Sequence, residues 1–263
     1  MHDNLGFALT RLDAIGWPSV RDYLAGDDRI IVVFGSTENN GPHLPLGSDT
    51  VAAETVADEA ARRTGVLVAP TIPWGNSSVN MGFAGTIALE PRLLLDLVAG
   101  ICSSLAFHGF RRFAVVTGHY GNVWPVASVA ETLRDRGLIV AQLDLWRTIE
   151  KHCRDLPVTH AMPFGHGGEM MTSVVMAAGG EIETGRMTVE LPEESYGLKY
   201  YRSYPEVMGF SAWDEITGSG AVGDATAASA PTGREAIERV TAILVELLAD
   251  LRLAPMPEVR RFD

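Results

Sequence analysis

Short apolar runs rich in β-branched residues alternate with helical patterns along this chain, and this alternation constrains the fold more than any other feature. The apolar runs are 29–36, 66–75, 111–122 and 138–146, and the helical patterns are 48–65, 90–109, 124–137, 167–180 and 233–253. Strands that alternate with helices form a mainly parallel sheet with helices on both faces. We therefore expect a single α/β domain over residues 1–263, a length that buries a large core.

Two of the predicted helices carry start and stop signals. Ser48 or Asp49 is expected to cap the first helix, and Gly65 is expected to end it. Pro91 occupies the first turn of the next helix, which ends at Gly109. The first set of signals leaves a polar loop between a buried strand and a helix.

The charge and the cysteine content exclude several classes of protein. The formal net charge is −12, and phosphate binding needs a basic face, so we expect no nucleic-acid partner. Cys102 and Cys153 cannot build a disulfide framework and are expected to be reduced, structural thiols of a cytoplasmic protein. No signal peptide is visible, and no apolar run reaches the roughly 18 residues of a membrane span, so we expect no membrane partner.

Two polar loops follow predicted strands. The stretch STENNGPHLPLGSDT, residues 36–50, contains Glu38, His43 and Asp49, and His119 lies in a later glycine loop. Ligands of a parallel sheet bind beyond the carboxyl ends of its strands. Carboxylates and imidazoles are ligands of zinc and similar metals. The two loops together therefore predict a metal site at one edge of the sheet.

Spacing alone leaves other interpretations of these residues open. Asp49 can be a helix cap, Glu38 a solvated carboxylate and His119 a hydrogen-bonded loop residue. His166 and Glu169 lie three residues apart at a predicted helix start, which can place a proton-transferring imidazole and a carboxylate on one face. The other histidines are expected to be structural or surface residues: His2, His108, His152 and His160.

Aromatic residues flank the candidate loops. Trp74, Tyr120 and Trp124 can line a pocket or pack in the core. The region 181–224 has weak periodicity, which indicates long loops that form a lid or a subunit contact. No GxSxG elbow, P-loop or GxGxxG after a strand is present, so the signatures of serine hydrolases and of nucleotide-binding enzymes are missing.

Five ordered motifs over nearly the whole chain resemble those of the creatininase family, which comprises creatinine amidohydrolase and its relatives. The motifs are GSTENNGPHLPLGSDT, PTIPWGNSSVNMGFAGTIAL, TGHYGN, HGGEMMTS and GAVGDATAASAPTGREAIE. The resemblance implies a creatininase-like α/β fold. It does not identify the substrate.

The family's chemistry is the hydrolysis of a non-peptide C–N bond, often in a cyclic amide or a formamide. Water for this reaction is activated by one or two zinc or manganese ions. The resemblance implies that Glu38 and His119 hold one metal, that Asp49 bridges to a second metal, and that His166 handles protons. It further implies a small-molecule substrate and a homo-oligomer, often a hexamer.

The chain departs from the family pattern at three site positions. Asn40 stands where the family has another metal-binding His, and Gly121 stands where creatininase itself has a metal-binding Glu. Asn80 replaces a further family His. Relatives with glycine at the second of these positions usually use the glutamate that corresponds to Glu169, so we expect Glu169 to be a ligand and a catalytic residue.

Three functions remain open at this point. The first is a metal-dependent amidohydrolase built on Glu38, Asp49, His119 and Glu169. The second is an enzyme of the same fold with a modified, single-metal site that acts on an unusual lactam or ester or catalyses a non-hydrolytic reaction. The third is a non-catalytic binding protein, which is disfavoured because buried carboxylates without a cation are costly.

We expect the substrate pocket of either enzyme to be lined by five residues that neighbour the candidate ligands in the sequence. They are His43, Trp74, Asn80, Tyr120 and Trp124.

Overall fold

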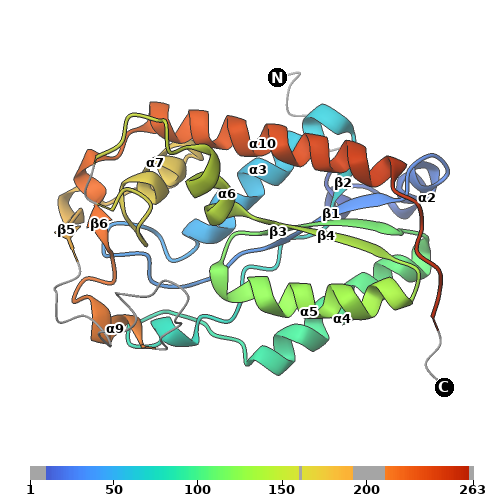
Figure 1. The fold of residues 1–263 in the computed structure, drawn as a ribbon, viewed down its shortest axis with the longest axis horizontal. Helices are drawn as coiled ribbons and strands as arrows, with labels where there is room; N and C mark the ends of the chain where they lie inside the picture. Colours follow the sequence, from blue (N-terminus) through green and yellow to red (C-terminus); the bar gives the residue numbers. More distant parts are fainter. Residues whose placement is uncertain (1–9, 160–161, 192–210, 261–263) are drawn as a thin grey trace.

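The computed structural model describes residues 10–159, 162–191 and 211–260, and it contains the predicted parallel sheet. The strands are β1 (Arg29–Phe34), β2 (Leu67–Val68), β3 (Arg112–Thr117) and β4 (Ile139–Asp144). Their order in the sheet is β2-β1-β3-β4, and every pairing is parallel. All four strands run in one direction, so their carboxyl ends lie at one edge (Figure 1).

Helices cover both faces of this sheet, as expected (Figure 1). One face carries α3 (Ser48–Thr64), α6 (Leu145–His152), α7 (Glu169–Ala177) and α10 (Ala230–Leu253), and the other carries α4 (Pro91–His108) and α5 (Val123–Asp135). The side chains of β1 alternate between the two cores: Ile31 and Val33 pack toward α3 and α10, whereas Ile30, Val32 and Phe34 pack toward α4. The predicted α/β fold class is confirmed.

Several shorter elements complete the described chain. An N-terminal helix, α2 (Trp17–Leu24), which the sequence patterns did not indicate, packs against the same core cluster as α4. The region 181–224 contains β5 (Val189–Glu190), α9 (Trp213–Ile216) and β6 (Gly223–Asp224), joined by loops. Residues 192–210 of this region, together with His2 and His160, lie outside the described residues.

The start of α3 differs from the prediction. The residue at the N-cap is Gly47, and no side chain caps the helix, so neither Ser48 nor Asp49 has that role. The predicted stop is correct: Gly65 adopts a left-handed conformation with φ 72°. The carboxylate of Asp49 is therefore free to bind elsewhere.

Two strands are shorter than predicted. The run 66–75 forms a ladder only at Leu67 and Val68, followed by a single bridge between Ile72 and Phe34. Prolines at 70 and 73 lack the backbone N–H that a ladder needs, which explains the early end. The strand predicted over 138–146 ends at Asp144, whose side chain accepts a hydrogen bond from the backbone N–H of Arg147 and starts α6.

The helix α4 differs from the expectation that no apolar run is long enough to span a membrane. Its 18 residues have a mean hydropathy of 1.2, which by length and composition alone is enough to cross a membrane. Leu94, Val98 and Cys102 of this helix are nevertheless buried against the sheet. A core-facing helix of a folded domain meets the same criterion, so this helix is weak evidence for a membrane partner.

Candidate metal centre

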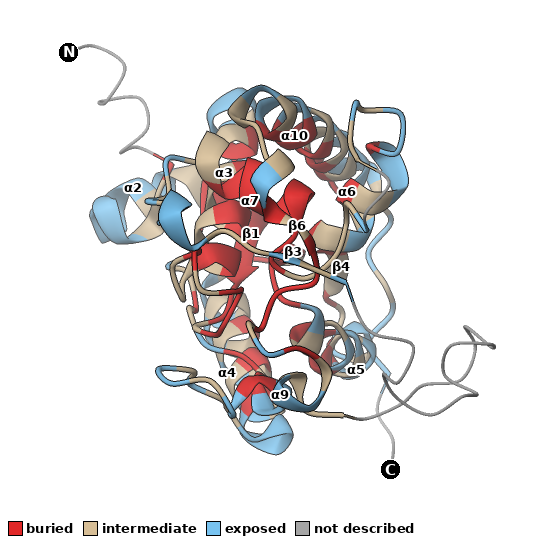
Figure 2. Ribbon diagram, turned by 90° about the vertical axis from the view of Figure 1, so that its left-hand side faces the viewer, coloured by how far each residue is buried: buried red, intermediate tan, exposed pale blue. Residues whose placement is uncertain are grey.

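Two carboxylates and one imidazole meet at the carboxyl edge of the sheet. Glu38 lies in the loop after β1, Asp49 in the first turn of α3, and His119 directly after β3. One potential ligand atom from each of the three lies within 4.8 Å of the other two, and all three residues are buried. Figure 2 looks onto this edge and shows buried segments between the two helical layers.

The imidazole of His119 is oriented by a backbone carbonyl. Its Nε2 lies 2.9 Å from the backbone oxygen of Asn76, and because a carbonyl only accepts, Nε2 must carry the proton. Nδ1 faces the carboxylates, at 3.1 Å from Glu38 and 3.4 Å from Asp49. In the neutral ring this tautomer leaves the Nδ1 lone pair directed at the two acids, which is the orientation of a metal ligand.

The charges of His119 and Glu38 act on each other. Burial lowers the pKa of His119, but the carboxylates of Glu38 and Asp49 outweigh burial and raise it well above its usual value. Burial raises the pKa of Glu38, but the nearby charge and hydrogen bond of His119 hold it below its usual value. Both carboxylates thus require positive charge beside them, which a divalent cation supplies.

Asp49 is held by two side chains. Its Oδ2 accepts a hydrogen bond from the hydroxyl of Ser36 at 2.7 Å, and its Oδ1 accepts one from the indole of Trp146 at 2.9 Å. The same indole N–H also approaches the backbone oxygen of Gly118 at 2.6 Å. Groups of this kind fix the direction of a ligating carboxylate. The sequence patterns assigned no such role to Ser36 or Trp146.

A buried asparagine ties the three loops of the site together. The Nδ2 of Asn122 donates to the backbone oxygen of Gly35 at 2.9 Å, and its Oδ1 accepts from the backbone N–H of Asn76 at 3.1 Å. Asn122 thereby holds the carbonyl that orients His119. The signal in the sequence was an asparagine in the TGHYGN loop after a strand, but its partners lie more than 40 residues away in the chain.

Gly121 allows two of these loops to approach closely. A Cβ at this position would lie 2.2 Å from the backbone oxygen of Asn76 and 2.5 Å from Nε2 of His119. The glutamate that creatininase itself has at this position would therefore find no room in the present arrangement. The hydrogen bond between His119 and Asn76 therefore requires a glycine at position 121.

Several buried polar atoms near these ligands have no hydrogen-bond partner within the described residues. They include Oε2 of Glu38, Oδ1 of Asn40, Nδ1 of His43 and the hydroxyl of Ser77. The carboxamide of Asn80 is unpartnered at both its oxygen and its nitrogen. Each such group costs about 1–3 kcal/mol when buried alone, so their concentration in two loops suits a site that binds a polar or charged partner.

The ring nitrogens of His43 can be assigned from its neighbour. Nε2 lies 2.9 Å from the hydroxyl of Thr172, and that hydroxyl donates to the backbone oxygen of Gly167. Nε2 must therefore donate, which leaves an unprotonated Nδ1. Burial lowers the pKa of His43 and favours this neutral form.

His166 and Glu169 occupy different positions relative to the three ligands. Nε2 of His166 donates to the backbone oxygen of Asn39 at 2.8 Å, and the ring stacks on Trp213 at a centroid distance of 4.5 Å. No ligand atom of His166 belongs to the three-residue group of Glu38, Asp49 and His119. Glu169 is buried but does not belong to the three-residue group: its Oε2 accepts from the backbone and hydroxyl of Thr159.

The aromatic residues expected in a pocket are on the surface. Trp74, Tyr120 and Trp124 are 45%, 53% and 63% exposed. The guanidinium of Arg147 stacks over the ring of Tyr120 at 4.5 Å and donates to its hydroxyl. The core-packing alternative is therefore wrong for all three residues, and a substrate-binding role for them stays a prediction.

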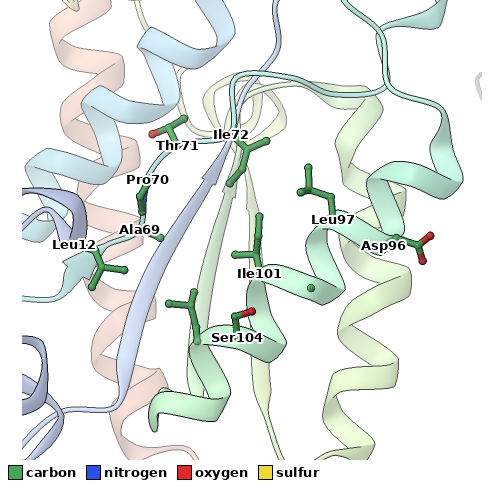
Figure 3. Close-up of a pocket in the computed structure, with 11 residues that line it drawn as sticks. Leu12, Ala69, Pro70, Thr71, Ile72, Asp96, Leu97, Ile101 and Ser104 are labelled. Carbon is green, nitrogen blue, oxygen red and sulfur yellow. The ribbon is translucent and has the colours of Figure 1, made fainter. Parts of the chain in front are cut away.

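A separate cavity of about 570 Å³ lies between α4 and the segment 69–72 (Figure 3). Its lining is mainly apolar, with Leu12, Ile72, Leu97 and Ile101 among the contributing residues. None of the candidate ligands lines this cavity. The chemistry expected of the chain therefore lies at the sheet edge and not in this cavity.

The edge of the sheet thus presents two carboxylates and one oriented imidazole in a buried setting. This arrangement suits a divalent cation that activates water, which is the chemistry of metal-dependent hydrolases. The chain belongs to the creatininase family of hydrolases, because the family model described as creatinine amidohydrolase matches residues 13–248.

Two curated relatives share moderate sequence identity with this chain. The 3-dehydro-scyllo-inosose hydrolase of Thermotoga maritima is 28% identical over 250 residues, which cover 88% of this chain and 80% of that protein. The mycofactocin precursor peptide peptidase of Mycobacterium tuberculosis is 36% identical over 118 residues, but these cover only 41% of this chain and 47% of that protein. The two relatives are described as acting on different substrates.

Solved structures support the fold. A zinc form of a mutant creatininase and a manganese form of creatininase each match with a TM-score of 0.76. Each match covers 94% of this chain and 99% of the other, at 21% identity. At this identity the likeness establishes the arrangement of helices and strands and does not assign the roles of side chains.

Proposed function

We propose that this protein is an amidohydrolase that cleaves a non-peptide C–N bond of a small molecule, in a cyclic amide or a formamide. The observation that carries the proposal is the buried group of Glu38, Asp49 and His119, with His119 oriented by Asn76. The family model and the match to a small-molecule hydrolase over most of the chain support it.

The residues present fit a divalent metal. Glu38 has a buried oxygen without a partner, and Nδ1 of His119 faces both carboxylates. We propose zinc or manganese, one or two ions per chain, with Glu38, Asp49 and His119 as ligands; the zinc and manganese forms of creatininase support this choice. A metal bound there would lower the pKa of a coordinated water and polarise the carbonyl of the substrate.

The chain's own residues supply orientation and proton transfer. Ser36 and Trp146 hold the carboxylate of Asp49, and Asn76 holds the ring of His119. The neutral ring of His166 carries its proton on Nε2, which donates to Asn39, so its Nδ1 is free to accept a proton. We propose that His166 is the proton-transferring residue and that Glu169 supports the loop that contains Thr159, with a ligand role for Glu169 as a further prediction.

A second function is favoured by one observation. Asn40 is fully buried, and its oxygen lacks a partner two residues from Glu38. An amide oxygen binds zinc less well than an imidazole does, so the centre can hold a single metal. The corresponding enzyme would act on an unusual lactam or ester or catalyse a non-hydrolytic step.

A substrate screen distinguishes these functions. Protein loaded with zinc or manganese is assayed against cyclic amides, formamides and lactones, with Asp49→Asn and His119→Gln as inactive variants. Asp58→Asn is the matched control, because Asp58 lies on the same helix outside the metal group. We expect hydrolysis by the wild type and by the control only. Full activity in either site variant would contradict the proposal.

We further propose a cytoplasmic homo-oligomer. The two cysteines are buried and free, as expected of reduced thiols, and burial raises the pKa of Cys102 to about 12. An exposed apolar face of α4 offers a surface for self-association. A hexamer is the assembly that the family resemblance implies, and light scattering of the purified protein measures it.

A further inference from the structure

An arginine and a tyrosine contact each other where the metal group meets solvent. Tyr120 directly follows His119, and Arg147 directly follows Trp146, whose indole N–H binds Asp49. The guanidinium of Arg147 stacks over the ring of Tyr120 at 4.5 Å, and its Nη2 donates to the Tyr120 hydroxyl at 2.5 Å. His119 and Asp49 are buried, whereas Tyr120 and the side chain of Arg147 are more than half exposed. The arginine and the tyrosine therefore form part of the rim of the buried group.

The guanidinium of Arg147 is oriented, but most of its donors are unused. Its Nε lies 3.6 Å from Oδ2 of Asp144, a distance that allows an ion pair but not a normal hydrogen bond. Its Nη2 binds Tyr120, and its Nη1 has no hydrogen-bond partner among the described residues. A guanidinium has five N–H donors in a planar fork. The side chain is therefore held in one direction while several donors remain available to a ligand.

The stability of its own helix does not explain the position of Arg147. The residue lies in the first turn of α6, where backbone N–H groups carry partial positive charge and a cation is unfavourable. Asp144 is the N-cap of α6 and offsets this charge in part. An ion pair with a largely exposed partner adds little to folding stability. A cation that is fixed at the rim without stabilising its helix suits the recognition of an anion.

We propose that Arg147 binds a carboxylate of the substrate, so that the preferred substrates are cyclic amides or formamides that carry a carboxyl group. A planar guanidinium binds a carboxylate through two parallel hydrogen bonds. The chain has a formal net charge of −12, and Glu38 and Asp49 add negative charge at the site, so a fixed cation at the rim offsets their repulsion of an anion. The inference rests on the proposed amidohydrolase function and names its substrate class.

The test uses pairs of probes that differ by one carboxylate: pyroglutamate with pyrrolidinone, and N-formylglycine with N-methylformamide. Binding to zinc-loaded protein is measured by saturation-transfer nuclear magnetic resonance, and hydrolysis is measured in parallel. Arg147→Gln removes the charge, and Arg147→Lys keeps the charge without the planar fork. Arg154→Gln is the matched control, because Arg154 is another exposed arginine with an ion pair on the same helix, to Glu150. Melting temperatures show that each variant is folded.

We expect the wild type and Arg154→Gln to bind the acidic member of each pair about tenfold more tightly than the neutral member. Arg147→Gln should lose this preference, and Arg147→Lys should retain part of it. A wild type without the preference, or the same preference in Arg147→Gln, would overturn the inference. A wild type that binds the acidic probes through Arg147 but hydrolyses no cyclic amide or formamide would instead overturn the proposed function.

Discussion

At the scale of single residues, hydrogen-bond partners decide what each site side chain can do. Nδ1 of His119 faces Glu38 and Asp49 because Nε2 donates its hydrogen bond to the backbone oxygen of Asn76. The carboxylate of Asp49 is not used as a helix cap, because Gly47 is the N-cap residue of α3. Residue type and position made Glu38, Asp49 and His119 candidates, and only the family resemblance implied that they are metal ligands. Their partners were not predictable, because those contacts come from loops distant in the sequence.

Trp146 provides a residue-scale test of these partners. Trp146→Phe keeps an aromatic ring but removes the indole N–H that binds Asp49. We expect metal affinity to fall about 10–100-fold, as is usual when a group that orients a ligand is lost. Calorimetric titration with manganese measures the change. The exposed Trp124 provides the control, since Trp124→Phe should leave the affinity unchanged. Equal affinities in both variants would contradict the role of Trp146.

Asp58 gives the chain a pH-dependent stability. Burial raises its pKa to about 6, and its contact with Arg11 only partly offsets burial. The folded state therefore holds the Asp58 proton more tightly than the unfolded state does, and stability falls as pH rises from about 4 to about 6.

Asp58→Asn should remove this penalty while Arg11 keeps its ion pair with Glu54. We expect the variant to gain about 1–3 kcal/mol of unfolding free energy at pH 8 and almost nothing at pH 4. Urea denaturation at the two pH values measures the difference. A gain of the same size at both values would show that the Asp58 charge is not responsible.

At the scale of elements, the site depends on three loops that meet beyond β1, β2 and β3. Alternating strand and helix patterns predicted most of the elements, and proline and glycine signals predicted where α4 begins and where α3 and α4 end. The patterns overestimated β2, which ends early because its prolines lack the N–H that a ladder needs. They also missed the short helices α2 and α6 as separate elements. The region 181–224 was correctly interpreted as loop-rich in its described part.

The close approach of two of these loops can be tested at Gly121. Gly121→Ala places a methyl group against the Asn76 carbonyl and the His119 ring, so one of them must move. We expect at least a tenfold loss of metal affinity and a loss of about 1–3 kcal/mol of stability. The control is Gly100→Ala in α4, where a Cβ meets nothing within 4 Å. That control should be neutral or stabilising because alanine favours helix, and wild-type metal binding in both variants would contradict the account.

At the scale of the whole molecule, the sheet and its two helical layers follow the family pattern. The helix α4, however, exposes large apolar side chains to solvent. Leu93 and Phe107 are 55% and 85% exposed, whereas Leu94, Val98 and Cys102 of the same helix face the core. Exposed apolar patches of this kind mark interfaces. The sequence predicted an oligomer only through resemblance, since hydrophobic periodicity does not distinguish a core-facing side chain from an interface-facing one.

We expect the exposed face of α4 to contribute to self-association. Leu93→Glu combined with Phe107→Glu should lower the molar mass measured by light scattering, with little change in the melting temperature. Leu253→Glu on α10 is the matched control, because Leu253 is 83% exposed on a different surface. An unchanged mass in the double variant would place the contacts elsewhere, with the region 181–224 as the next candidate.

The central claim is that Glu38, Asp49 and His119 together bind a divalent metal. Its most direct test is calorimetric titration of manganese into chelator-stripped wild-type protein and into Asp49→Asn, whose carboxamide keeps the shape of the side chain but not its charge. We predict that the wild type binds at least one ion per chain and that the variant binds it at least tenfold more weakly. Equal binding by the two proteins, or no binding by the wild type, would contradict the claim.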